Sequence, residues 1–223
     1  MKLILASSGF NSKEAVDQCI KFVGKPAKEI SFGVINEAYV PYHFPHNWVI
    51  DDLISIKDNF SNNIELIPLS LDINEVERRL SDKDVIFVIG GNTAYLKTVF
   101  DKSGFSTLLP KLLDHKVYIG SSAGSMILGH CPTKETLLQT SGEEDDFSVT
   151  DYLNLLDFSM IPHIYGRFTL PNADKQVTIE SKKQQYAVYG ISDDAAIIVD
   201  GDKIYVVGKD YLVAENGRIK EQG

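Results

Sequence analysis

The chain has 223 residues, and 22 Lys and Arg against 31 Asp and Glu give a formal net charge of −9 at pH 7. This acidic balance argues against a nucleic-acid-binding surface. Hydrophobic residues make up 43% and charged residues 24% of the chain, close to the globular average, which excludes disordered and collagen-like classes. At roughly 150 residues per domain, we expect a single domain spanning residues 1–223.

The lengths of the apolar runs and the number and spacing of the cysteines indicate the cellular compartment of the protein. No apolar run approaches the roughly 18 residues that cross a bilayer, and the first apolar stretch is too short for a signal peptide. We therefore expect a cytoplasmic protein that does not bind membranes. Its two cysteines, Cys19 and Cys131, form neither a disulfide framework nor a CxxC motif, so a buried, unreactive thiol is predicted for each.

Short apolar runs alternate with amphipathic segments through the first half of the chain. The runs are rich in Val and Ile and are bounded by turn residues, as is typical of buried parallel strands; they cover residues 2–6, 31–35, 64–69, 85–89 and 117–120. Helical spacing predicts a helix ending at Gly24, one capped by Asp72, one starting near Thr93, and one over 107–114. This alternation predicts an α/β fold with a mostly parallel sheet covered by helices.

The C-terminal third has a different pattern. Its strand-like runs are separated by tight turns such as Asp200-Gly201, and they cover residues 188–192, 195–199, 203–207 and 211–214. This spacing predicts antiparallel hairpins on one edge of the sheet.

The main chemical motif is a G-x-S-x-G sequence, Gly120-Ser121-Ser122-Ala123-Gly124. It follows a predicted strand and precedes an apolar helical run, which is the context of a nucleophile elbow. In such an elbow the central Ser122 sits in a strained turn, so that its hydroxyl projects above the sheet. A phosphate-binding loop is less consistent with the sequence, because no Lys follows the second glycine.

A serine nucleophile needs a base, and the chain offers five histidines. His43 and His46 lie in a predicted loop and lack the Cys or carboxylate pattern of a metal site, so no metal is expected. His115 and His130 are interpreted as structural or surface residues. His163 follows an apolar run at 158–161, which places it at a strand's C-terminal end, where active sites of open α/β sheets gather.

The segment Gly90-Gly91-Asn92-Thr93 ends one strand and opens a helix. Asn and Thr favour helix caps, so a tight turn and an N-cap are one interpretation. Glycine also lets a backbone amide approach a ligand closely, and we assign Gly91 and Ala123 as donors to an oxyanion. Asn92 is a candidate substrate-binding residue.

Together, Gly90-Gly91-Asn92-Thr93, the elbow around Ser122, and Pro162-His163 resemble the peptidase E family of serine peptidases, which includes aspartyl dipeptidase and the cyanophycinases. The resemblance covers most of the chain. It implies a three-layer α/β/α fold similar to class I glutamine amidotransferases and flavodoxin-like proteins. It also implies that Ser122 is the nucleophile and that His163 is the base, without a cofactor.

The third member of the triad is less well defined by the resemblance. Aspartyl dipeptidase is described with an Asp about fifteen residues after the serine, and this count falls on Leu137 here. Cyanophycinase-like members use a carboxylate downstream of the histidine, in a segment similar to 190–195. We therefore assign Asp193 as the residue that orients His163. The alternative carboxylates for this position are Asp194, Asp157 and Glu135.

The resemblance implies a small peptide substrate, a dipeptide with an N-terminal Asp, whose side chain needs a cation. Arg167 is the nearest candidate in sequence, and Lys134 is a weaker one. A catalytically silent binding or regulatory module is the alternative function, and the departure at Leu137 supports it. The sequence leaves the oligomeric state open.

Overall fold

The computed structural model describes residues 1–60, 63–140, 149, 151–166 and 172–223. Its centre is a seven-stranded sheet in the order β3-β2-β4-β5-β1-β8-β9. The strands are β1 (Lys2–Ala6), β2 (Phe32–Ile35), β3 (Ile64–Leu66), β4 (Val85–Val88), β5 (Val117–Ser121), β8 (Ala195–Asp200) and β9 (Lys203–Gly208). The first five run parallel, whereas β8 and β9 are antiparallel to their neighbours.

The central sheet lies between two hydrophobic cores. Successive residues of β1 alternate between them: Leu3 and Leu5 face one core, and Ile4 faces the other. Strand side chains on both faces are buried, which explains why the parallel strands appear in the sequence as continuous apolar runs. The arrangement is a three-layer α/β/α architecture, as predicted.

On the side of the sheet that Ile4 faces, the helices are α1 (Lys13–Val23) and α2 (Asn47–Asn59). On the side that Leu3 and Leu5 face, they are α3 (Ile73–Ser81), α4 (Thr93–Ser103), α5 (Phe105–Leu112) and α6 (Ala123–Met126). Gly24 ends α1 in the left-handed conformation and Asp72 caps α3, as predicted. The side chain of Ser12 accepts a hydrogen bond from the Ala15 amide at the start of α1. Short 3₁₀ turns occupy Ala27–Glu29 and Glu37–Tyr39. Helix α2 was not predicted from the sequence.

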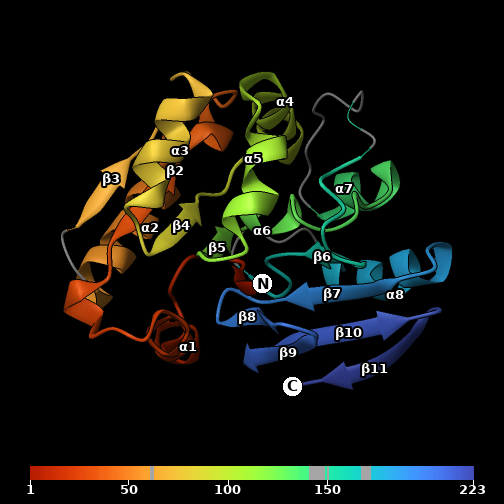
Figure 1. Ribbon diagram of the computed structural model, residues 1–223. Coiled ribbons are helices and arrows are strands. Elements are labelled where there is room, and N and C mark those ends of the chain that lie inside the picture. The colour runs from red at the N-terminus through yellow and green to blue at the C-terminus, as the bar shows by residue number, and fades with distance from the viewer. Residues whose placement is uncertain (61–62, 141–148, 150, 167–171) are drawn as a thin grey trace.

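A second sheet holds the remaining strands of the C-terminal third, which Figure 1 draws in teal and blue beside the blue β8 and β9 of the main sheet. Its order is β11-β10-β7-β6, with β6 (Phe158–Ile161), β7 (Ala187–Ile191), β10 (Tyr211–Glu215) and β11 (Arg218–Gln222). Helices α7 (Lys134–Thr140) and α8 (Ala173–Lys183) pack beside each other, and α8 covers this sheet. Strands β8 and β9 form the predicted antiparallel hairpin at the edge of the main sheet, whereas β7 and β10, predicted for the same edge, belong to the second sheet.

The cysteines differ from each other in burial. Cys19 lies on the buried face of α1, as predicted, and burial raises the pKa of its thiol far above the usual value. Cys131 is only half-buried, and partial burial raises its pKa to about 11. In the part of the chain that the structure describes, no helix is long and apolar enough to cross a membrane.

Candidate active site

Ser122 lies at the sharp turn between β5 and α6, with φ 48° and ψ −110°. Such a conformation is strained for a non-glycine residue and is typical of a nucleophile elbow. Gly120 and Gly124, on either side of Ser122, have no room for a side chain. A Cβ at Gly120 would lie 2.5 Å from the backbone of Gly124, and a Cβ at Gly124 would lie 2.1 Å from the carbonyl oxygen of Val88.

His163 lies just beyond the carboxyl end of β6, in the turn that the sequence pattern predicted. Its Nε2 is 3.0 Å from the Oγ of Ser122, and its Nδ1 is 2.6 Å from Oδ1 of Asp193. Asp193 occupies the short connection between β7 in the second sheet and β8 in the main sheet. The three side chains therefore form one hydrogen-bonded chain across the junction of the two sheets.

The interactions within these three hydrogen-bonded side chains favour an ionised Asp193. The hydrogen bond from His163 lowers the pKa of the Asp193 carboxyl, and the charge of His163 and a bond from Ser8 add to this effect, against a contribution from burial. The side chains of His163 and Asp193 are 32% and 34% exposed, so the pair is open to a substrate and partly shielded from water.

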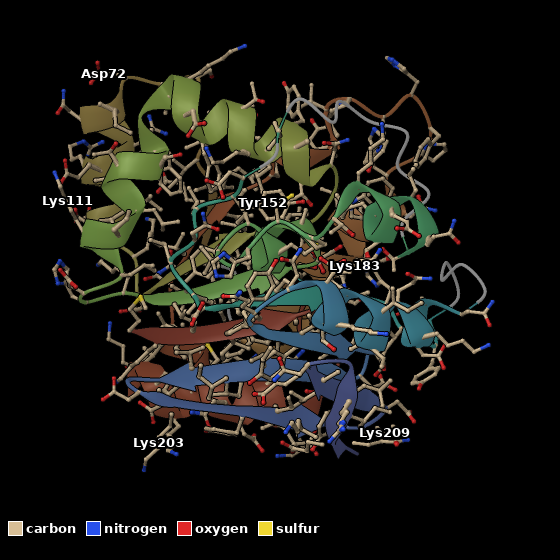
Figure 2. The ribbon with its side chains drawn as sticks, turned by 90° about the vertical axis from the view of Figure 1, so that its right-hand side faces the viewer. Asp72, Lys111, Tyr152, Lys183, Lys203 and Lys209 are labelled. Atoms are coloured by element: carbon tan, nitrogen blue, oxygen red, sulfur yellow. The ribbon has the colours of Figure 1, made fainter. Side chains whose placement is uncertain are left out.

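The other carboxylates considered for this position lie elsewhere. Asp194 is exposed, next to Asp193. Asp157 contacts Nε2 of His130 at 3.0 Å, while the ring of His130 stacks on Tyr186. Glu135 on α7 pairs with Lys183 at the end of α8, at 2.6 Å (Figure 2 labels Lys183). Of the four candidates, only Asp193 lies within hydrogen-bonding distance of His163 in the described residues.

The Gly90-Gly91 segment packs directly against the elbow. A Cβ at Gly90 would lie 2.8 Å from the Cβ of Ser122, and one at Gly91 would lie 2.4 Å from the carbonyl oxygen of Ala38. Gly91 has φ 145°, in the region that favours glycine. Gly90 therefore packs against Ser122 and Gly91 against Ala38, and neither position has room for a Cβ.

Asn92 directly follows Gly91, and Ala123 directly follows Ser122. Asn92 caps α4 by accepting a hydrogen bond from the Tyr95 amide at 2.7 Å, and it is 1% exposed. The structure therefore gives Asn92 the capping role, and its contact with a substrate stays a prediction. Ala123 opens α6, where the first amides of a helix have no acceptor within the helix itself.

Two further sequence-based predictions concern the cation that would bind the substrate carboxylate and the absence of a metal site. Arg167 lies outside the described residues. His46 packs against the rings of Tyr39, Phe44 and Trp48 in the loop before α2. Within the described residues, no group of three or more His, Cys, Asp or Glu side chains could hold a metal ion.

A buried carboxyl group lies behind the elbow. Asp52 on α2 is 6% exposed, and its side chain receives a hydrogen bond from Ser121, the residue before Ser122. Burial raises its pKa from the usual 3.8 to about 7, with Asp51 adding to the shift and Ser121 and His163 opposing it. Neither periodicity nor a motif marked Asp52, because a single acidic residue on a helix usually faces solvent.

Replacing Asp52 with Asn is expected to stabilise the protein at pH 8. The folded protein keeps a proton on Asp52 that the unfolded chain loses above pH 4, so stability falls as pH rises from about 4 to about 7. This group accounts for a loss of up to about 4 kcal/mol in the free energy of unfolding. Asp52→Asn should remove that loss, as measured by urea unfolding at pH 4 to 8.

Asp58, which is exposed on the same helix, provides the control for this prediction. Asp58→Asn should leave the pH dependence of unfolding close to that of the original protein, because it leaves the burial and the neighbours of Asp52 unchanged. Equal pH slopes for the original protein and Asp52→Asn would show that Asp52 is ionised in the folded state.

Known proteins resemble this chain in sequence. The profile of peptidase family S51 matches residues 3–207. A protein from Listeria monocytogenes named uncharacterized peptidase Lmo0363 is 31% identical over 133 residues, covering 59% of this chain and 64% of that protein. The chain therefore spans just under two thirds of that relative. The uncharacterized peptidase PM1590 of Pasteurella multocida is 28% identical over 152 residues, covering 67% and 70%.

Solved structures show the same fold. A crystal structure of a candidate peptidase E protein from Listeria monocytogenes EGD-e has a TM-score of 0.73 at 23% identity, covering 93% of this chain and 98% of that one. A peptidase from an acI-B1 Actinobacterium has a TM-score of 0.65 at 17% identity, covering 98% and 92%. The predicted amidotransferase-like α/β fold is confirmed. Because the family profile covers nearly the whole chain, the chain belongs to peptidase family S51.

Proposed function

We propose that this protein is a serine peptidase that hydrolyses small peptides through an acyl-enzyme. The observation that carries the proposal is the hydrogen-bonded chain from Ser122 Oγ through His163 to Asp193. A serine hydroxyl is a weak nucleophile until a base takes its proton, and an imidazole held by a carboxylate is suited to that task.

The reaction uses each group in turn. Ser122 Oγ attacks the peptide carbonyl while His163 Nε2 accepts the hydroxyl proton, and Asp193 stabilises the imidazolium that forms. The amides of Gly91 and Ala123 are the proposed donors to the oxyanion, because both lie in turns that border Ser122. His163 then gives its proton to the leaving amine. A water molecule, activated by the same imidazole, releases the acyl group and restores Ser122.

We further propose that the substrates are dipeptides with an N-terminal Asp. Carboxylate recognition needs a cation, and Arg167 is assigned that role on charge and sequence position alone. Asn92 is the other proposed substrate contact.

A panel of Asp-Leu, Glu-Leu, Asn-Leu and Ala-Leu tests the proposal. The purified protein is expected to cleave Asp-Leu in preference to the other three, measured by release of free leucine. An Arg167→Gln variant should lose this preference while cleaving Ala-Leu at the unchanged rate. Cleavage of all four at equal rates would reject the Asp preference. No cleavage by the folded protein would reject the peptidase and favour a silent binding module.

A further inference from the structure

One short segment contacts every element that carries the proposed triad. Ser7, Ser8 and Gly9 follow β1 directly, at the carboxyl edge of the central sheet. Ser8 Oγ donates to Oδ1 of Asp193 at 2.9 Å, Ser7 Oγ accepts from the His163 amide at 3.0 Å, and the Gly9 amide donates to Ser121 Oγ at 3.1 Å. We propose that this segment aligns the triad, and that Ser8 is the positioning residue for Asp193.

Ser8 acts on the same oxygen that His163 contacts. Oδ1 of Asp193 receives both the Ser8 hydroxyl and the His163 Nδ1 contact. The carboxylate is one third exposed, so without a second donor it can rotate toward water. A hydrogen bond to an ionised acceptor is stronger than a neutral one and fixes the side chain in one rotamer. Ser8 thereby keeps Asp193 in line with His163.

Ser7 secures the backbone of the base. His163 has φ 62°, a conformation that costs free energy for a histidine and needs support from its surroundings. Ser7 is 1% exposed, and its hydroxyl donates to the Ile191 carbonyl at 2.9 Å while accepting from the His163 amide. One side chain from the main sheet thus joins the His163 turn to the end of β7 in the second sheet.

Gly9 completes the alignment on the side of the nucleophile. Its φ is 47°, and a Cβ there would lie 2.4 Å from Oδ1 of Asp52. Because no side chain is present, the Gly9 amide reaches Ser121, whose hydroxyl is in turn bonded to Asp52. The triad is assembled from three separate stretches of the chain, and residues 7–9 contact all three.

The inference about Ser8 rests on the proposed function, and kinetics provide its first test. Ser8→Ala is expected to lower kcat for Asp-Leu by about tenfold to hundredfold with little change in KM, because the lost bond orients a catalytic group and touches no substrate. Ser8→Thr, which keeps the hydroxyl, should restore most of the rate. Ser106→Ala is the matched control, since Ser106 donates to Asp101 at 2.6 Å on the surface, outside the proposed site.

A double-mutant comparison separates positioning from a general structural effect. If Ser8 acts through Asp193, Ser8→Ala should cost nothing further in the Asp193→Asn background. The inference would be overturned if the two decreases in kcat multiply in the double variant, or if Ser8→Ala leaves kcat unchanged. Equal urea midpoints for Ser8→Ala and the original protein confirm that the fold is intact.

A spectroscopic measurement decides the inference even if the protein cleaves no peptide. In protein labelled with ¹⁵N-histidine, the Nδ1 proton of His163 is assigned by its loss in His163→Gln. Ser8→Ala should make this proton exchange faster with water, because Asp193 no longer stays in line, whereas Ser106→Ala should leave the exchange rate unchanged. Unchanged exchange in Ser8→Ala overturns the role of Ser8, and an inactive original protein overturns only the proposed function.

Discussion

Ser122→Ala is expected to lower kcat for the best dipeptide by about 10⁵-fold. The variant removes the only atom of the side chain that can form the acyl-enzyme, and the residual rate comes from substrate binding and the oxyanion donors. The fold should persist, because alanine can replace serine at the elbow without adding atoms. The measurement is leucine release under saturating substrate, together with the urea midpoint of each protein.

Ser125→Ala provides a control within the same turn. Ser125 Oγ donates to the backbone carbonyl of Ala6 at 2.8 Å, and the side chain is buried. Its loss should lower the free energy of unfolding by about 1 kcal/mol and change kcat only a few-fold. A Ser122→Ala protein that turns over at the original rate would refute the proposed mechanism.

Asp193→Asn is expected to lower kcat by about 10⁴-fold, the second-largest effect. The asparagine amide can present its NH₂ group to Nδ1 of His163, which places the imidazole proton on Nε2, where it blocks acceptance of the Ser122 proton. The imidazolium formed during the reaction also loses its anionic partner. The measurement is kcat against pH for dipeptide hydrolysis.

Asp194 offers a matched control for this prediction, since it is the adjacent acid and is exposed. Asp194→Asn should keep kcat within a few-fold. The reverse result, with a large loss in Asp194→Asn and none in Asp193→Asn, would show that the neighbouring carboxylate orients His163 in solution.

The parallel half of the fold was largely predictable from local sequence. Residues 2–6 and 117–120 appear as buried strands because both faces of a parallel sheet are covered, which requires continuous apolar runs. The helix over Lys13–Val23 has a Ser cap and a glycine stop, which are local signals. Helix α2 was missed because its aromatic and polar residues give a weak apolar stripe, and packing on the core stabilises it.

The assignment of Asp193 had a different basis, namely its position downstream of the histidine in the resemblance. Sequence spacing alone left Asp194, Asp157 and Glu135 as alternatives. The choice depends on how the chain crosses from β7 to β8, where Ser192 bonds to the Asp194 amide at 3.1 Å and sets the turn. The conformation of that turn determines that Asp193, and not Asp194, faces His163.

Local sequence patterns were sufficient to predict the elbow at Ser122, the parallel strands and the position of His163 at a strand end, because glycine spacing and apolar periodicity are local properties of the chain. The tertiary structure alone decided which C-terminal strands form a second sheet, since edge hairpins and a separate sheet have the same strand pattern. It also decided the contacts of Ser8 with Asp193, 185 positions apart, and the burial of Asp52. Such contacts depend on which loops lie next to each other at the edge of the sheet, and local sequence patterns do not predict which loops become neighbours.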